Sequence, residues 1–187
     1  AVLIGGCDAR QAKVKELRRR VGLVTQNVEL FHGTIRDNLT MFDESVDDGK
    51  ILEVLRELGL MDWLSAQPAG LDSVLDAGGG GLSAGEAQLL AFARVFLRNP
   101  GVIVLDEASS RLDPATEERM ERAVTKLLQG RTCIIIAHRL RTVERADDIL
   151  ILEDGCVAEY GPRAELSRDP SSRFSRLLKT GLEEVLA

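Results

Sequence analysis

Apolar and polar residues follow two different patterns along this chain. In its second half, short uninterrupted apolar runs at residues 102–105 and 132–137 alternate with segments of helical periodicity. Runs of this length, bounded by turn residues, predict strands buried on both faces. Strands that alternate with helices predict an α/β fold whose parallel sheet is covered on both sides.

The segment from residue 34 to residue 99 has a helical pattern that interrupts this alternation. Ser83 and Glu86 fit a capping box, in which each side chain covers the other residue's free N–H, and the helix that follows is expected to end near Asn99-Pro100. We therefore predict an α/β core at residues 1–33 and 100–187 and an inserted helical lobe at residues 34–99. Expected lobe faces are Ile35, Leu39 and Phe42 on one side, and Ile51, Leu52, Leu55 and Leu58 on another.

Turn residues and short periodic runs define the remaining elements. We expect strands at residues 1–4, 21–25 and 148–153, the last one followed by a hairpin turn at Asp154-Gly155. A basic helix is expected at residues 13–20, a loop at 70–81 and a helix from Asp113-Pro114 to Gly130.

Composition narrows the class of protein. Hydrophobic residues make up 44% and charged residues 29% of the 187 residues, as in globular proteins, and the net charge of −6 argues against a nucleic-acid partner. No apolar run approaches the roughly 20 residues of a membrane helix. Three cysteines without CxxC spacing favour a reducing, cytoplasmic setting and argue against a disulfide framework or a metal site built on cysteine.

Polar side chains follow three of the predicted strands. Asp106 and Glu107 come directly after residues 102–105, Gln26 follows residues 21–25, and His138 follows residues 132–137. Ligands of open α/β sheets bind at the carboxyl ends of strands. An acid there can hold hydrated Mg²⁺, a second acid can polarise a water for attack on phosphorus, and a histidine can donate to a phosphate. Each residue alone also fits a structural role; their combination predicts one phosphate site.

The Gly-rich loop that leads to Ser83 suggests an anion site at a helix start. Free backbone N–H groups and the positive end of the helix dipole attract anions there, and Gly85 permits close approach. An ordinary capped helix after a flexible loop explains the same residues. Asp113 is expected to cap the next helix.

Taken together, these motifs resemble the nucleotide-binding domain of ABC transporters. The sequence VTQ at 24–26 looks like the Q-loop, and LSAGEAQ at 82–88 resembles the LSGGQxQ signature. The sequence VIVLDEASSRLD at 102–113 is similar to the Walker B strand with the D-loop, and IIAHRL at 135–140 to the H-loop strand. LFHGTIRDN at 30–38, the AHRL ending and Glu159-Tyr160-Gly161 resemble exporter-type domains in particular.

The resemblance implies a role for each matching residue in ATP hydrolysis. Glu107 acts as the general base and His138 contacts the γ-phosphate. Asp106 and Gln26 would hold Mg²⁺. Ser83, Gly85, Gln88 and Asp113 would face ATP held by a second nucleotide-binding domain in a head-to-tail dimer. The implied setting is the cytoplasmic face of the plasma membrane, where a transmembrane domain is the other partner.

Three departures from the family pattern affect this prediction. Ala84 and Glu86 replace Gly and Gln of the signature, and Arg111 stands where the D-loop usually has a small residue. No G-x-x-x-x-G-K-[ST] sequence occurs, although the phosphate-binding Walker A loop has this pattern. In the family this loop precedes the strand that opens the present sequence. We therefore expect an N-terminally incomplete P-loop sheet, weak ATP binding by the isolated chain, and an exposed sheet edge prone to association.

Two other hypotheses fit parts of the sequence. A soluble ABC-type ATPase that acts on ribosomes or DNA would also tolerate Glu86 in the signature. A degenerate dimerisation module would explain the lack of a Walker A pattern. The exporter-like segment at 30–38 argues against the first, and the intact Glu107 and His138 argue against the second.

Overall fold

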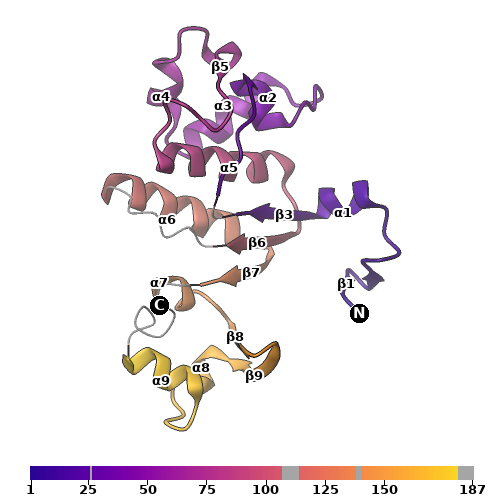
Figure 1. Cartoon of the computed structure of the whole chain (residues 1–187), viewed down its shortest axis with the longest axis vertical. Coiled ribbons are helices and arrows are strands. Elements are labelled where there is room, and N and C mark those ends of the chain that lie inside the picture. The colour runs from indigo at the N-terminus through magenta and orange to yellow at the C-terminus, as the bar shows by residue number, and fades with distance from the viewer. Residues whose placement is uncertain (26, 107–113, 138–139, 181–187) are drawn as a thin grey trace. The chain divides into compact units, whose positions relative to one another are not determined.

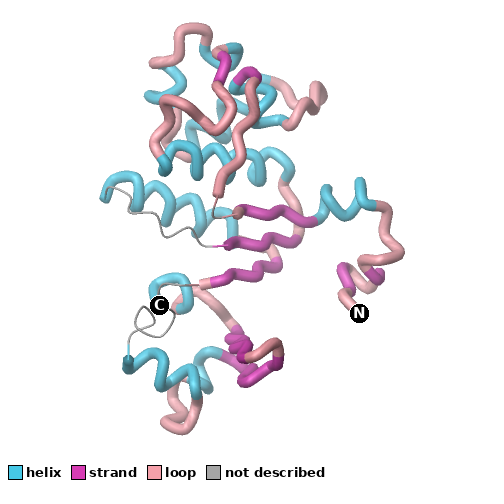
Figure 2. The backbone as a smooth tube through the Cα atoms, viewed as in Figure 1, coloured by secondary structure: helices cyan, strands magenta, loops and turns pink. Residues whose placement is uncertain are grey.

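The computed structural model describes residues 1–25, 27–106, 114–137 and 140–180. Helices and strands alternate between α5 and β8, whereas α2, α3 and α4 follow one another directly (Figures 1 and 2). The elements are β1 (Leu3–Ile4), β2 (Cys7–Asp8), α1 (Val14–Arg20), β3 (Val21–Val24), β4 (Gly33–Thr34), α2 (Ile35–Thr40), α3 (Asp48–Glu57), α4 (Met61–Ser65), η1 (Gly70–Asp72), β5 (Val74–Leu75), α5 (Ala84–Arg98), β6 (Val102–Asp106), α6 (Pro114–Leu128), β7 (Thr132–Ile136), α7 (Leu140–Val143), β8 (Asp148–Glu153), β9 (Cys156–Pro162), α8 (Arg163–Leu166) and α9 (Arg173–Thr180).

Contacts divide the chain into two compact units, Ala1–Ile134 and Ile135–Ala187. A three-stranded sheet has the order β3-β6-β7; β3 and β6 run parallel within the first unit, and the division between the units falls inside β7. The α/β fold with a parallel sheet is thus confirmed. The predicted boundaries between core and lobe lie inside this first unit and stay predictions. None of the described helices has both the length and the apolar character needed to cross a membrane.

Helix α5 lies directly on β3, and a glycine makes this close packing possible. A Cβ atom added at Gly22 would lie 2.8 Å from Cγ1 of Val95 and 2.7 Å from Cγ of Pro100. Both distances are shorter than carbon atoms tolerate, so any larger residue at this position would push the helix off the strand. Gly22 therefore fixes the separation between the sheet and α5.

The helical lobe has a closed apolar core made by α2, α3, α4 and α5. Its fully buried side chains include Ile35, Leu39, Ile51, Leu55, Leu60, Leu89 and Leu90. The predicted helical character of the chain from residue 34 onward is thus confirmed, although the structure divides this segment into separate helices.

Phe42 does not share the buried face of Ile35 and Leu39, so that prediction is wrong. Helix α2 ends at Thr40, and Met41 and Phe42 both have positive φ, at 56° and 64°. The reversed backbone turns the Phe42 ring onto Phe31, with ring centroids 4.9 Å apart, and leaves Phe42 65% exposed. A left-handed helix end, which the apolar pattern does not reveal, is the reason.

Helix α5 has both of its predicted ends. Ser83 is the N-cap, and the reciprocal hydrogen bonds of the capping box with Glu86 are present. At the other end Asn99 is the C-cap, in the left-handed conformation that asparagine tolerates well. The loop expected at residues 70–81 is only partly irregular, because η1 lies within it and β5 pairs with β4.

One of the two sheet faces that were predicted to be covered is covered by α5. Side chains alternate across a strand, and Ile103 and Leu105 of β6 are buried on the α5 side. On the other side Leu23 of β3 is 58% exposed. Cover of this second face stays a prediction, because residues 107–113 and 138–139 lie outside the described part of the chain.

The second unit is organised around the β8–β9 hairpin. Val143, Ile149 and Phe174 form its small buried core. Glu159 on β9 accepts hydrogen bonds from the backbone N–H groups of Arg173 at 3.0 Å and Phe174 at 2.8 Å, and from Ser172 Oγ at 3.0 Å. Glu159 thus caps the start of α9, and this contact gives the exporter-like Glu-x-Gly sequence a structural role.

Candidate functional site

The carboxyl ends of β3 and β6 lie at one edge of the sheet. Their parallel register pairs Val24 with Leu105, so Thr25 and Asp106 are the next positions along the two strands. Asp106 ends β6 and is half-buried. Gln26 and Glu107 follow these two residues in sequence but lie outside the described residues, as do His138 and Asp113. The predicted convergence of Gln26, Asp106, Glu107 and His138 on one phosphate site is therefore untested.

The N-terminus of α5 has defined hydrogen bonds around Ser83. Its backbone N–H donates to Glu86 Oε2 at 2.8 Å, and its Oγ lies 2.9 Å from the same oxygen. The N–H of Glu86 in turn donates to Ser83 Oγ at 3.2 Å. In the first turn of any α-helix the leading N–H groups have no partner within the helix, and a capping box leaves those of Ala84 and Gly85 available to another acceptor.

A side chain of α5 connects this helix to the sheet edge. Gln88 is 5% exposed, and its Nε2 donates to the carbonyl oxygen of Thr25 at 3.4 Å. This contact places the first turns of α5 beside the carboxyl end of β3, one residue before Gln26. The structure thus brings Gln88 and the residue adjoining Gln26 together, while Ser83 and Gly85 stand one turn earlier on the same helix.

The described residues fit a nucleotide with Mg²⁺ only in part. Asp106 offers a carboxylate of the kind that holds hydrated Mg²⁺, although the described part of the chain contains no cluster of three His, Cys, Asp or Glu side chains arranged for a metal. The start of α5 offers N–H donors to an anion. The Glu86 carboxylate lies on Ser83 Oγ, so Ser83 must release Glu86 before its hydroxyl can donate to a phosphate.

Two further polar residues organise this region, and sequence analysis did not single them out. Arg94 on α5 and Asn38 on α2 join these helices to the segment that follows Gln26. The available signal was a lone arginine within the apolar run of residues 89–97.

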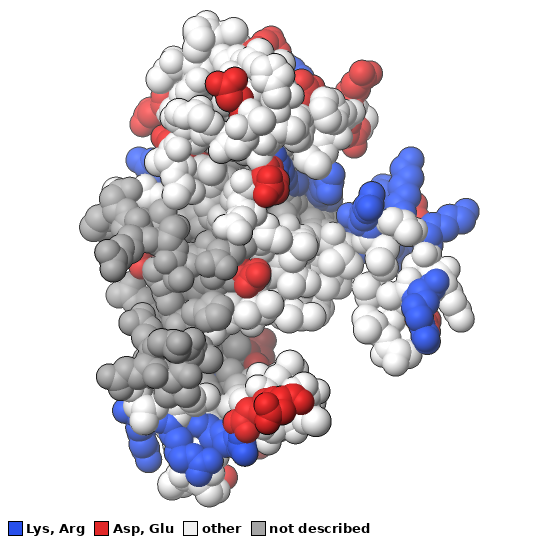
Figure 3. Space-filling view, viewed as in Figure 1, with Lys and Arg blue, Asp and Glu red and all other residues white. Residues whose placement is uncertain are grey.

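The charged surface of the first unit is uneven. Figure 3 shows Lys and Arg side chains gathered on the segment around α1, whose last turn contains Arg18, Arg19 and Arg20. Helix α1 contributes no buried residue. The site residues described above lie on other elements, so this basic segment is separate from them in the chain.

Comparison with known proteins identifies the family and the fold. The family model described as "ABC transporter" matches residues 1–110, which include β3, α5 and β6. This chain belongs to the ABC transporter family. The family match covers α5, which is the helix of the signature sequence, and the end of β6 at Asp106. The resemblance inferred from the motifs is therefore confirmed.

Relatives in the ABC transporter family align with nearly the whole chain. The ABC-type transporter fsqE of Aspergillus fumigatus is 40% identical over 88% of this chain and 13% of its own length. The ATP-dependent lipid A-core flippase of Yersinia pestis is 40% identical over 89% of this chain and 29% of its own. The alpha-hemolysin translocation ATP-binding protein HlyB of Proteus vulgaris is 39% identical over 94% and 25%.

A solved structure gives the same result at the level of the fold. A bacterial Atm1-family ABC exporter with ATP bound has a TM-score of 0.82 and 31% sequence identity, covering 95% of this chain and 31% of that chain. The present chain therefore spans less than a third of each of the relatives described here.

Proposed function

We propose that this chain is the ATP-binding and ATP-hydrolysing domain of an ABC exporter, which couples hydrolysis to substrate export across a membrane. The observation that carries the proposal is the meeting of α5 with the carboxyl end of β3, through Gln88 and Thr25, beside the strand that ends at Asp106. Relatives named as a flippase and a hemolysin translocator support the exporter class.

Each site residue has a chemical role in this proposal. Glu107 acts as general base toward the attacking water, and His138 donates a hydrogen bond to the terminal phosphate. Asp106 and Gln26 hold Mg²⁺, which supplies positive charge that stabilises phosphoryl transfer.

The signature helix serves a second copy of the site. Ser83 and Gly85 donate to the γ-phosphate of ATP bound by a partner nucleotide-binding domain, and Gln88 and Asp113 complete that head-to-tail contact. Glu86 brings a carboxylate beside the same phosphate, which weakens the attraction of the helix end for an anion. A transmembrane domain is the second partner, and the setting is the cytoplasmic face of the plasma membrane.

The test uses the protein encoded by the complete open reading frame that contains this sequence. This protein is purified and reconstituted in lipid vesicles. ATPase activity that falls at least 100-fold in Glu107→Gln, with ATP binding retained, is the expected result, because the amide cannot accept the proton of the attacking water. Activity that is unchanged in Glu107→Gln would overturn the proposed base. Absence of ATPase activity in the wild type would favour the non-catalytic dimerisation module instead.

The isolated 187-residue chain provides a separate test. It contains no Walker A sequence, so the lysine and backbone groups that hold the β- and γ-phosphates are not supplied by this chain. Calorimetric titration with Mg-ATP should give a dissociation constant weaker than about 1 mM, which corresponds to about 4 kcal/mol of binding free energy. Micromolar binding would refute this expectation.

A further inference from the structure

Arg94 makes an unusual set of contacts for a half-buried arginine. Its Nε donates to the backbone oxygen of Asn38 at 2.7 Å, its Nη1 to the backbone oxygen of Glu29 at 2.8 Å, and its Nη2 to Asn38 Oδ1 at 3.1 Å. No carboxylate is among the hydrogen-bond partners that the structure describes for it. Burial lowers the pKa of Arg94, and nearby Arg98 lowers it further; the guanidinium nevertheless stays charged.

The geometry of its donors suits an arginine to this position. A half-buried cation without an acidic partner is costly unless its donors are satisfied. The guanidinium fork points separate N–H groups in fixed directions, so one side chain can hold several oxygens at once, and a lysine ammonium has no such fixed fork. The oxygens of Asn38 and Glu29 belong to α2 and to the strand-to-lobe connection, so Arg94 links both to α5.

Asn38 extends the same network to Phe31. Asn38 is 1% exposed, its Nδ2 donates to the backbone oxygens of Phe31 at 3.0 Å and Thr34 at 3.1 Å, and its Oδ1 accepts from the Phe31 N–H at 3.2 Å. The next residue back, Leu30, is buried, and its carbonyl accepts from the N–H of Gly78 at 2.9 Å. Residues 29–31 are therefore anchored to the helical lobe by several independent contacts.

On the other side of Gln26 the chain belongs to the sheet. Val24 makes the last ladder pair of β3, with Leu105. Between this pair and Glu29, Gln88 of α5 donates a hydrogen bond to the backbone oxygen of Thr25, and its length of 3.4 Å is near the limit for such a bond. Residues 25–28 are thus the segment of chain that joins β3 to the anchored residues 29–31.

We propose that Arg94 is a positioning residue that fixes the lobe side of this connection. It makes residues 29–31 move with α5, so that a displacement beside Gln26 is passed to the signature helix instead of being absorbed in the segment after it. Arg94 thereby couples the segment beside Gln26 to α5, and the consequence of this coupling for transport rests on the proposed function.

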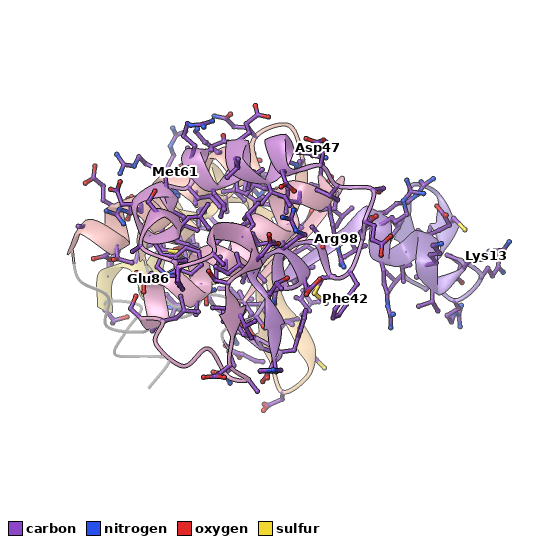
Figure 4. All side chains as sticks on the ribbon, turned by 90° about the horizontal axis from the view of Figure 1, so that it is seen from above. Lys13, Phe42, Asp47, Met61, Glu86 and Arg98 are labelled. Carbon is purple, nitrogen blue, oxygen red and sulfur yellow. The ribbon has the colours of Figure 1, made fainter. Side chains whose placement is uncertain are left out.

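The first experiment tests whether Arg94 acts as a clamp that holds residues 29–31 on α5. It uses the 187-residue chain without any ligand. Amide hydrogen exchange at Phe31 should be about tenfold faster or more in Arg94→Met and Arg94→Lys, because both variants lose charge-assisted hydrogen bonds that hold Asn38 and Glu29. Amides of α3 should exchange as in the wild type. Arg98→Met is the matched control, because Arg98 is an exposed arginine one turn further along α5 (Figure 4), and it should change nothing.

Three outcomes of this experiment are informative. Unchanged exchange at Phe31 in both Arg94 variants overturns the clamp. Faster exchange throughout Arg94→Met indicates that this variant is globally destabilised. In that case Arg94→Lys, which keeps the charge and most of the side-chain volume, decides whether the clamp exists. Faster exchange at Phe31 in the lysine variant, with α3 amides unaltered, supports the clamp.

The second experiment tests coupling in the complete reconstituted protein. In Arg94→Lys the amount of substrate transported per ATP hydrolysed should fall about tenfold, with basal ATPase activity and the KM for ATP within about threefold of the wild type. ATPase activity and transport that fall in equal proportion would overturn the coupling role, since a general structural defect gives that result. A wild type without ATPase activity refutes the proposed function, whereas the exchange result at Phe31 still decides the clamp.

Discussion

The helical lobe and the strands differ in how completely they bury their apolar side chains. In the lobe Leu55 and Leu89 are buried by α2, α3, α4 and α5, elements that all lie within this chain. In the strands Leu23, Ile134 and Leu152 face solvent on one side. Apolar residues recur in both regions. The difference teaches that apolar runs report a requirement for cover, which the described helices of the lobe meet more completely than the described strands do.

The largest expected effect is in the lobe core. Leu55→Ala should lower the free energy of unfolding by about 2–5 kcal/mol, because it removes buried methyl groups and leaves a cavity. Leu23→Ala is the matched control on the strands and should cost less than about 0.5 kcal/mol, because its side chain is already exposed. Urea unfolding followed by circular dichroism measures both. Equal losses in the two variants would abolish the distinction between lobe and strands.

The next effect concerns the start of α5, where the lobe borders the site. Ser83→Ala removes the capping box and should cost about 1 kcal/mol of stability. Ser83→Asp keeps an N-cap acceptor and should stay within about 0.5 kcal/mol of the wild type. Thermal unfolding of both variants tests this. If Ser83→Asp is as unstable as Ser83→Ala, the cap is not what Ser83 contributes to the fold.

A smaller effect is expected from pH in the second unit. Burial raises the pKa of Glu159, but the hydrogen bonds from Phe174, Arg173 and Ser172 outweigh it, so its pKa in the folded chain lies below the usual value. A lowered carboxyl pKa stabilises the fold above the unfolded pKa of about 4.3, and that stabilisation is lost as the pH falls through the folded pKa.

Glu159→Gln isolates this contribution from those of other acids. The stability difference between wild type and Glu159→Gln should be largest near pH 7 and should shrink below about pH 4. Hydrogen exchange at the Phe174 amide, whose N–H donates to Glu159, measures the local stability of the second unit directly. A difference that stays constant from pH 7 to pH 3 would show that the carboxylate charge is unimportant.

The smallest change in stability is expected on the exposed strand surface, where association changes instead. Leu152→Gln should alter the free energy of unfolding by less than about 0.5 kcal/mol. It should also reduce self-association of the chain, because Leu152 lies beside Val157 on the exposed apolar side of the β8–β9 hairpin. Sedimentation analysis measures this, with Lys50→Gln as a control for an exposed polar site. Equal association in all three chains would refute the apolar explanation.

Local sequence signals predicted local structure well. The Ser-x-x-Glu sequence fixed expectations for the start of α5, and the capping box is present; Asn99-Pro100 marked its end correctly. Strand β6 was predicted from four consecutive apolar residues, and it extends to Asp106. These features depend on residues a few positions apart, so a short stretch of sequence contains the information.

Contacts between distant residues were not predictable in the same way. Arg94 and Asn38 are 56 positions apart, and nothing in either segment alone indicates their hydrogen bonds. The placement of Phe42 failed because a left-handed turn at Met41 reversed the chain. At the site, the sequence predicted Asp106 and the signature helix, whereas the contact from Gln88 to Thr25 required the structure.

The capping box at Ser83 also affects how quickly α5 can engage a partner. Because Glu86 and Ser83 complete the helix end by themselves, this end is ordered without any ligand. An arriving phosphate or protein surface therefore does not have to order the backbone of the first turn, and it loses no affinity to that entropy cost. In the proposed function, the remaining cost of anion binding at this helix end is the displacement of the Glu86 carboxylate from Ser83 Oγ.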